Sequence, residues 1–479
     1  ENIINADPNL SPLQDNGGKT LTQIPLEGSP AIDAGDNTQI PADTFDLDGD
    51  GDTNEPIPFD QRGEGFDRLL NGTVDIGAVE GLSVSEPTTL VIDLLTDEDD
   101  GDLSVGDVSL REAIGAIADG GIITFDSAIA GGTITLKGSE LLIDKPLTID
   151  GDTNNITIDA DDNSRVFKID DGDSESAIEV TLEGITITGG TVSSETGFYD
   201  GGGILNRESL TVTNSTISGN SAQSGGGIFN EYGSTVIVSN STLSGNIAQA
   251  GGAISNYGYL TLYNSTLSEN DAELGGGIFN EGEGGEGGDV ALTTLVNSIV
   301  ANSENGGDLY LQSGVINASY SLIESNADQI NGTNVNNITG EDPQLTPLQN
   351  NGGITLTHAL LAESPAIDAG DNGQIPPDTP FDQRGEGFDR VLNNTVDIGA
   401  VEANIVNQPP TANDDAGIDF TTDEDTGFTT GNVLNNDTDA DDDTLAVSAI
   451  DLTSTVGEVI DNEDGTFDYD PNGQFESLN

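Results

Sequence analysis

A glycine-rich hexapeptide that returns at a nearly constant interval constrains the fold of this chain more than any other feature. Gly-Gly-Gly-Ile-Leu-Asn begins at Gly201, and related hexapeptides begin at Gly225, Gly251 and Gly275, with spacings of 24, 26 and 24 residues. A β-rich run follows each hexapeptide and ends in an Asn-Ser pair; these pairs begin at Asn214, Asn240, Asn264 and Asn297. Periods in the twenties are typical of solenoids, whose repeats bury their apolar faces only by stacking.

The segment around these repeats, residues 122–340, alternates short β-branched runs with Gly, Asn and Asp turns. Alternation with period two predicts strands, and turns at fixed offsets stack each strand on its equivalent one repeat away. We therefore predict an all-β fold built on a right-handed parallel β-helix, the hand that parallel crossovers adopt. The segment has room for roughly nine coils and a rod of about 40 Å.

Charge is the most unusual compositional property. The chain has 11 Lys and Arg against 86 Asp and Glu, a formal net charge of −75. Such a chain is repelled by nucleic acid and by anionic membranes, so neither is an expected partner. Two interpretations of the carboxylates remain open: a solvated acidic surface suited to high salt, or ligands for divalent cations, which the clustering of Asp favours.

Cysteine is absent, which excludes disulfides and thiolate chemistry. Bound Ca²⁺ is then the expected stabilising cofactor of an extracellular protein. The sequence holds no run of 18 apolar residues, so we expect no direct membrane insertion.

Residues 1–81 and 341–403 are two copies of one module. Asp7 to Asn37 matches the second copy at an offset of 335 residues, and Pro58 to Glu80 matches at an offset of 322. The first copy therefore carries 13 extra residues, Phe45 to Ile57. Short strands punctuated by Pro and Gly suit a cap that covers the open end of a stack.

The blocks SPAIDAG and DIGAVE of this module resemble the choice-of-anchor domain, a C-terminal cap on bacterial surface β-helix proteins. The resemblance implies that residues 1–81 close a preceding β-helix and that residues 341–403 close the one described above. Arg62 and Arg384 recur at equivalent places, as do Arg68 and Arg390, and we interpret them as structural partners of nearby Asp residues.

Residues 82–121 contain the one clear helix signal, Ser109-Leu-Arg-Glu-Ala-Ile, with Asp107 or Ser109 as its N-cap. This run resembles the CSLREA domain that precedes bacterial surface β-helices, although Val108 stands where that family has Cys. We expect an N-terminal cap with a short helix.

Residues 404–479 follow an Asn-Gln-Pro-Pro linker. Their runs NVLNNDTDADDDTL and DGTFDYDP resemble a cadherin-like adhesin repeat of the VCBS or Ig-like kind. The resemblance implies a β-sandwich, here expected to be partial, so the fold class becomes a capped β-helix followed by an Ig- or cadherin-like domain.

Four acidic turns are candidate calcium sites. The insertion places oxygen ligands at alternate positions of a glycine-containing loop, as a calcium loop requires, but Ile57 stands where a bidentate Glu is usual. A second turn lies at 97–102, and two further turns of the C-terminal segment resemble calcium-binding turns of its family. The predicted ligands are Asp46, Asp48, Asp50, Asp52, Asn54, Asp97, Asp99, Asp102, Glu424, Asp437, Asp439, Asp441 and Asp443. The alternative in each case is a solvated acidic loop.

Within the repeats, Gly201, Gly225, Gly251 and Gly275 are interpreted as tight corners, and not as a phosphate cradle. Asn214, Asn240 and Asn264 form glycosylation sequons, but their register favours a ladder of stacked Asn side chains.

We expect no catalytic residues, because basic residues are scarce along the coils and carboxylate pairs are too common to single out. The predicted function is a calcium-stabilised stalk or adhesin segment of a bacterial cell-surface or filament protein, with surface glycans or neighbouring copies as partners. Two alternatives remain: a carbohydrate-active β-helix enzyme, and a self-assembling filament subunit.

Overall fold

The computed structural model describes most of the chain. The described ranges are 3, 6–14, 16–26, 28–47, 51–70, 72–81, 87–151, 154–173, 176–192, 200–282, 290–404, 410–423, 426–439, 444–453 and 455–472. The contacts divide the chain into two compact units, Glu1–Leu90 with Gly115–Ile122 and Val91–Ile114 with Ile123–Asn479.

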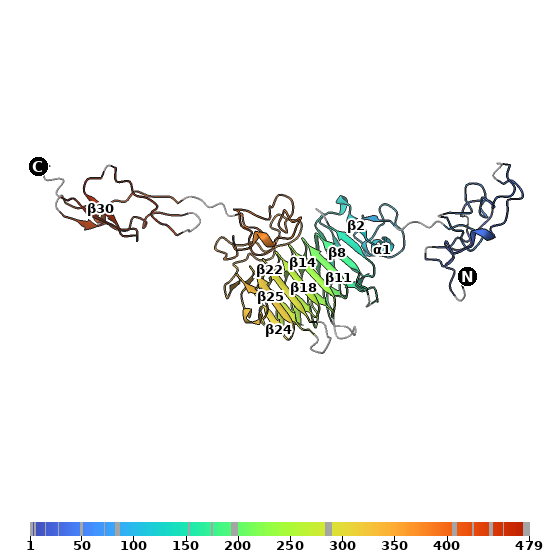
Figure 1. The fold of residues 1–479 in the computed structure, drawn as a ribbon, viewed down its shortest axis with the longest axis horizontal. Helices are drawn as coiled ribbons and strands as arrows, with labels where there is room; N and C mark the ends of the chain where they lie inside the picture. Colours follow the sequence, from blue (N-terminus) through green and yellow to red (C-terminus); the bar gives the residue numbers. More distant parts are fainter. Residues whose placement is uncertain are drawn as a thin grey trace. The chain divides into compact units, whose positions relative to one another are not determined.

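Three parallel sheets form the central body, and the strands visit them in turn, so each circuit makes one coil of a parallel β-helix (Figure 1). The first sheet has the order β1-β2-β5-β8-β11-β14-β18-β22-β25-β27. Its strands are β1 (Thr89–Ile92), β2 (Gly121–Phe125), β5 (Leu147–Asp150), β8 (Glu179–Glu183), β11 (Ser209–Thr213), β14 (Thr235–Ser239), β18 (Tyr259–Tyr263), β22 (Leu292–Val296), β25 (Val315–Ser319) and β27 (Asn334–Val335).

The second sheet is formed by β4 (Leu141–Ile143), β7 (Phe167–Ile169), β10 (Ile204–Asn206), β13 (Ile228–Asn230), β17 (Ile254–Asn256), β21 (Ile278–Asn280) and β24 (Leu309–Leu311). The third is formed by β3 (Thr133–Thr135), β6 (Ile156–Asp159), β9 (Ile185–Thr188), β12 (Thr216–Ser218), β15 (Thr242–Ser244), β19 (Thr266–Ser268), β23 (Ile299–Ala301), β26 (Leu322–Ile323) and β28 (Ile338–Thr339). A two-stranded sheet joins β16 (Ile247–Ala250) and β20 (Asp271–Leu274).

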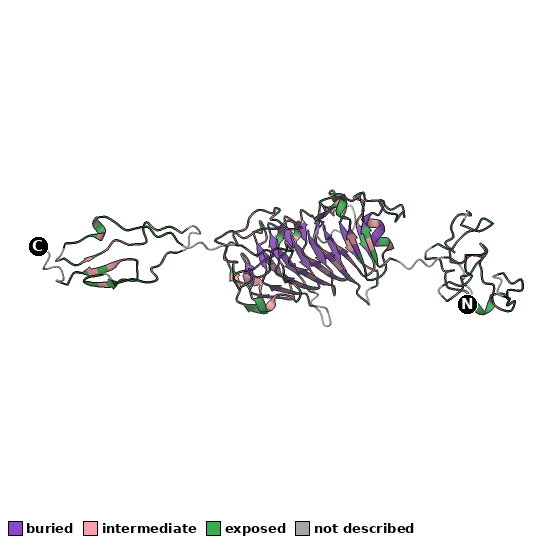
Figure 2. Ribbon diagram, turned by 90° about the horizontal axis from the view of Figure 1, so that it is seen from above, coloured by how far each residue is buried: buried purple, intermediate pink, exposed green. Residues whose placement is uncertain are grey.

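The repeat spacing appears directly in the strand register. Ile204 pairs with Ile228, which pairs with Ile254, which pairs with Ile278, so the offsets are those of the glycine hexapeptides. Alternate residues point inward: β11 and β14 both show the partly buried and buried alternation expected of a strand with one face in the core. Figure 2 shows the buried residues gathered along these strands. The all-β prediction and the parallel β-helix are thereby confirmed.

The helix α1 (Leu110–Ala116) begins after Ser109, as the sequence indicates. The Ser109 side-chain oxygen accepts from the Glu112 N–H at 3.2 Å, and the Glu112 carboxylate accepts from the Ser109 N–H at 3.1 Å. This reciprocal pair is a capping box, which satisfies two backbone donors at once. Arg111 fixes the helix to the first coils by donating to the carbonyl oxygens of Glu140 and Ser139. Short 3-10 turns lie at η1 (Asn37–Gln39), η2 (Ser127–Ile129), η3 (Ala327–Gln329), η4 (Asn372–Gln374) and η5 (Ile418–Phe420).

Residues 341–403 pack along the side of the β-helix. Their Ala366 and Ile398 share one buried cluster with Ile299, Ala301 and Leu322 of β23 and β26. The module therefore covers the third sheet laterally, where we had expected it to cover the end of the stack. Its hydrogen bonds reach coils from Asn214 to Asn297, so the module contacts several successive coils.

The C-terminal domain contains a small antiparallel sheet of order β29-β31-β30, with β29 (Phe428–Thr429), β30 (Glu458–Asp461) and β31 (Phe467–Asp470). Tyr469 lies opposite both Phe428 and Val459 and makes an edge-on ring contact with Phe428. Across the described residues, no helix is long and apolar enough to cross a lipid bilayer.

Candidate functional site

The insertion of the first module is an Asp-rich loop whose described side chains hold its own backbone. Asp46 has a φ of +54°, and its carboxylate accepts from the Gly51 N–H at 3.0 Å. Asp52 accepts from the Asn54 N–H at 2.9 Å. Asp48 and Asp50 lie outside the described residues. Asp43, which the sequence reading missed, is buried at the base of the loop and accepts from the Leu47 N–H at 2.6 Å.

The second acidic turn is organised by helix α1. Asp97 is buried and forms an ion pair with Arg111, in which the Nε–Oδ1 distance is 2.7 Å. The other Asp97 oxygen accepts from Arg111 Nη2 and from the Lys137 N–H. Both carboxylate oxygens thus have strong protein donors, so the structure gives Asp97 a structural role where we had predicted a calcium ligand.

The rest of this turn is exposed. Asp102 accepts from the Ser104 N–H at 2.9 Å, and hydrogen bonds from Ser104 lower the pKa of Asp102. Asp99 is exposed beside it. Glu112 accepts from the N–H groups of Asp100 and Gly101, so the turn wraps around the capping carboxylate of the helix.

In the C-terminal domain, Asp437 accepts from the Asn413 N–H at 2.7 Å and so joins two segments 24 residues apart. Asp439, two residues further along the chain, also belongs to the described residues, whereas Glu424, Asp441 and Asp443 lie outside them. Among the residues whose positions are described, no three Asp, Glu or His side chains converge as a metal site would require. The calcium sites therefore remain predictions.

The four repeat glycines lie at corners with positive φ values of 67°, 64°, 64° and 62°. At each corner an added Cβ would meet the carbonyl oxygen three residues on, for example that of Ile228 at Gly225. The atoms nearest to such a Cβ are mainly backbone atoms of the same coil, which fits the interpretation of these glycines as tight corners.

Asparagines form ladders inside the turns, in two registers that the sequence reading missed. Amide groups of Asn206, Asn230, Asn256 and Asn280 link successive coils at 2.9, 2.8 and 2.9 Å. A second ladder links Asn220, Asn246 and Asn270 at 3.0 and 2.9 Å. The recurrence of Asn at the last position of each hexapeptide was the available signal for the first ladder.

The predicted ladder at Asn214, Asn240 and Asn264 is looser. All three residues are left-handed, with φ values of 51°, 46° and 44°. Asn240 lies 3.5 Å from Asn214, and Asn297 lies 3.2 Å from Asn264. Asn240 also donates to the Phe381 carbonyl of the second module at 2.9 Å, so this turn serves as a docking edge.

Arg62 and Arg384 occupy matching positions in the two modules. Arg62 pairs with Asp60 at 2.7 Å and lies over the Phe66 ring, and Arg384 pairs with Asp382 at 2.6 Å and lies over the Phe388 ring. Both also donate to a carbonyl 18 residues on. Each arginine therefore closes its module around one buried carboxylate.

The second module contains a buried carboxylate with a strongly shifted pKa. Glu402 accepts from Arg390 Nη2 and from the Asp397 N–H, both at 3.1 Å. Burial raises the pKa of Glu402 to about 7 in spite of the Arg390 charge. Burial also raises the pKa of neighbouring Asp397.

We expect this carboxyl to make the docked module less stable as pH rises from about 4.5 to 7. The folded state binds the Glu402 proton more tightly than the unfolded state does. The protonated carboxyl therefore contributes fully to the free energy of unfolding below the unfolded pKa. This contribution, at most about 3 kcal/mol, is lost as the pH rises through the folded pKa. Melting curves at constant ionic strength should show a flatter pH dependence for Glu402→Gln. Identical slopes in the two proteins would contradict the assignment.

Polar groups of the second module meet a row of hydroxyls on the flank of the β-helix. Gln383 is buried; its Nε2 donates to Thr355 Oγ1 at 2.9 Å and to Thr216 Oγ1 at 3.2 Å, and its Oε1 accepts from Thr242 at 2.5 Å. Thr266 accepts from the Ala400 N–H at 3.0 Å. Sequence reasoning singled out none of these residues, because the contacts that join the module to the β-helix span more than 100 residues of sequence.

Three basic side chains on or against the β-helix have structural partners. His358 lies between the Thr346 carbonyl and the Ser244 hydroxyl, at 2.7 and 2.9 Å, and burial lowers its pKa. Arg165 pairs with Glu140 and donates to the Gly201 carbonyl, and Arg207 bridges Asp170 and Glu231 at 2.9 Å each. This arrangement ties neighbouring coils together.

Comparison with known proteins bears on two parts of the chain. Pectate lyase Pel9A has a crystal structure similar to the chain, at a TM-score of 0.37 and 14% identity, over 66% of this chain and 96% of that chain. A likeness at this level carries no argument about activity. No curated protein matches the sequence. The family model of the cadherin-like domain matches residues 406–478. The chain therefore joins a parallel β-helix to a cadherin-like domain.

Proposed function

We propose that the chain is a non-catalytic structural segment of an extracellular bacterial surface protein, acting as a stalk or adhesin. The observation that carries the proposal is the cadherin-like domain at residues 406–478, on a chain whose main body is a parallel β-helix. Ladders of buried Asn join its coils, which suits a stiff spacer.

The positions of the basic residues also favour a scaffold over an enzyme. A β-helix lyase needs a free Arg or Lys near a metal, whereas Arg165 pairs with Glu140 and donates to the Gly201 carbonyl, and Arg207 bridges the carboxylates of Asp170 and Glu231. To test this, the chain is incubated with acidic and neutral polysaccharides in the presence of Ca²⁺. We expect no new reducing ends or unsaturated products; calcium-dependent turnover would overturn the proposal in favour of a carbohydrate-active enzyme.

Calcium is proposed to bind the Asp-rich insertion and the turns around Asp437 and Asp439. The insertion offers Asp46, Asp52 and Asn54 with their sequence neighbours Asp48 and Asp50, a set of hard oxygen donors that suits Ca²⁺. When bound, Ca²⁺ supplies positive charge among the carboxylates of a chain with a net charge of −75.

We expect chelation of Ca²⁺ to lower the melting temperature of the module that carries the insertion. At free Ca²⁺ a hundredfold above the dissociation constant, one site adds about 2.7 kcal/mol to stability. The second module lacks the insertion and is an internal control. Hydrogen exchange should show calcium-dependent protection at residues 41–58 and none at residues 376–380. Equal exchange in both segments, with and without Ca²⁺, would show that the loop is merely solvated.

For an adhesin, surface glycans are the proposed ligands; for a stalk, neighbouring copies are the proposed contacts. Binding of the purified chain to glycan arrays, with electron microscopy of the same sample, separates these uses. Single rods with glycan binding support an adhesin. Ordered polymers without glycan binding would favour a filament subunit.

A further inference from the structure

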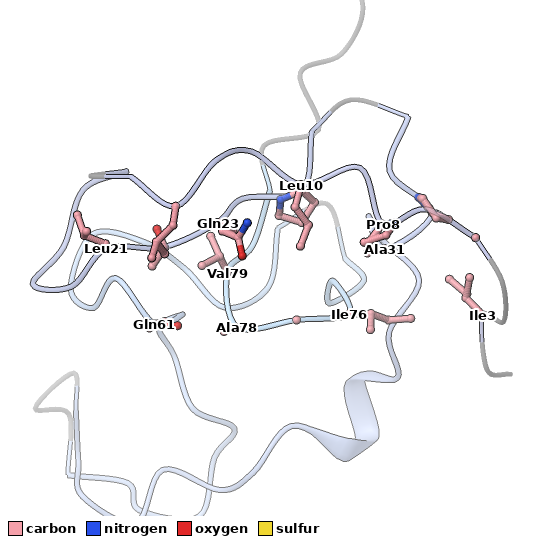
Figure 3. A pocket seen from close by; sticks show the side chains of 16 residues that line it. Ile3, Pro8, Leu10, Leu21, Gln23, Ala31, Gln61, Ile76, Ala78 and Val79 are labelled. Atoms are coloured by element: carbon pink, nitrogen blue, oxygen red, sulfur yellow. The ribbon is translucent and has the colours of Figure 1, made fainter.

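The first module exposes a groove whose counterpart in the second module is covered by the β-helix. The groove has a volume of about 700 Å³ and is lined by residues from three separate parts of the module, including Leu21, Gln23, Gln61, Ile76 and Ala78 (Figure 3). Figure 3 shows these side chains arranged around one hollow. Ile76 is 44% exposed and Leu21 is 56% exposed.

Every one of these five residues has an equivalent that contacts the flank of the β-helix. At the offsets of 335 and 322 residues they correspond to Leu356, His358, Gln383, Ile398 and Ala400. The Leu356 carbonyl accepts from Thr216 at 2.6 Å, His358 bonds to Ser244, and Gln383 bonds to Thr216 and Thr242. Ile398 and Ala400 are completely buried.

The polar groups of the first module are already set in the docking geometry. Gln61 Nε2 donates to Thr20 at 3.1 Å, as Gln383 donates to Thr355 at 2.9 Å. Gln23 donates to the Ser11 carbonyl at 3.0 Å, where His358 contacts the equivalent Thr346 carbonyl. Gln23 thus occupies the position equivalent to His358, and its side chain lines the groove (Figure 3).

The first module also has small residues at the positions where the second module is in close contact with the β-helix. At Gly399 an added Cβ would lie 2.8 Å from Ile299 and 2.9 Å from Thr266. At the equivalent Gly77 an added Cβ would meet nothing within 4 Å. Ala78 likewise matches Ala400, whose N–H bonds to Thr266. Gly77 and Gly399 both have positive φ values, of 144° and 112°, so their backbone conformation already favours glycine. Close approach of a β-helix explains the small side chain at 400, and the same explanation fits 78.

We propose that this face of residues 1–81 docks on the flank of a parallel β-helix other than the one in residues 122–340. The β-helix that binds this face carries Thr and Ser hydroxyls along an outer strand, as β12, β15 and β19 do, and Asn at the turn before that strand. The flank of residues 122–340 already carries the second module, so the partner is another stretch of β-helix with the same repeat chemistry.

The test uses the flank of this chain as the probe, because its chemistry is known. Ala400→Arg places a charge in the buried contact with Thr266 and should detach the second module. Thr242→Cys reports exposure of the flank, since the natural chain has no Cys. Thiol labelling of the Thr242→Cys chain should be slow with Ala400 intact and faster with Ala400→Arg.

In the Ala400→Arg protein the first module should then cover the free flank, in the same molecule or in another. Adding Ala78→Arg should accelerate labelling further, by roughly 100-fold if docking is worth about 2.7 kcal/mol. Ala78→Arg alone, with the second module docked, should leave labelling unchanged. If Ala78→Arg has no effect in the Ala400→Arg background, the first module does not recognise the flank and the proposal fails.

A chimera gives an independent result if Ala400→Arg unfolds the β-helix. Residues 342–403 are replaced by a second copy of residues 7–81, and the Thr242→Cys reporter is labelled. Slow labelling that becomes fast when the grafted copy carries the Ala78→Arg change supports the proposal. Fast labelling of a folded chimera contradicts it. Dimers of the natural chain that Ala78→Arg dissociates would show instead that the occupant is a second copy of this chain.

Discussion

Replacing Gly225 by Ala is expected to destabilise the β-helix by about 3–5 kcal/mol. Gly225 has a φ of +64°, and an added Cβ would press against the backbone of Ile228 and Phe229. Left-handed strain and a clash with backbone therefore add together, and neither can relax without moving the coil. Chemical unfolding monitored by circular dichroism gives the change in free energy.

Gly245 is a matched control for this substitution. Its φ is also +64°, but an added Cβ there would meet nothing within 4 Å. Gly245→Ala should therefore cost only the conformational strain, about 1–2 kcal/mol. If both substitutions have equal effects, backbone conformation alone governs the corners and the close contact between Gly225 and the backbone of Ile228 and Phe229 contributes nothing.

Replacing Asn246 by Ala is expected to cost about 3–5 kcal/mol. Asn246 donates to the Ile217 carbonyl and to Asn270, and its oxygen accepts two N–H groups of Asn220, all within 3.1 Å. Alanine removes these bonds and leaves buried groups of both neighbours without their partners. Because the loss reaches the coils on either side, the unfolding transition should also broaden.

Asn305→Ala serves as the control, since Asn305 is exposed and its amide bonds to Asp271 at 2.8 Å. An exposed hydrogen bond of this kind should contribute less than about 1 kcal/mol. Equal destabilisation by Asn246→Ala and Asn305→Ala would contradict a stabilising role for the ladder. Both variants are compared at one pH and salt concentration, because the chain is strongly acidic.

The four acidic turns predicted to bind calcium show how far the spacing of residues can predict a metal site. Alternating Asp residues in the insertion fit a calcium loop, and the described Asp46 and Asp52 hold the backbone turns of that loop. The same reasoning placed Asp97 in a metal site, but Arg111 pairs with it from 14 residues away. Composition within a turn cannot reveal a partner that the fold brings from a helix.

The sequence by itself determined the coil. The 24- and 26-residue spacings, the corner glycines and the period-two alternation are local properties, and stacking repeats them from one coil to the next, so the register at Ile204, Ile228 and Ile254 follows directly. The helix start at Ser109 was local in the same way. The tertiary structure decided which face of the β-helix the second module covers, which Asn residues form the tight ladders, and which carboxylates pair with Arg. These depend on surfaces that meet across long stretches of chain, where the outcome is set by apolar area and hydrogen-bond geometry that no short run of residues encodes.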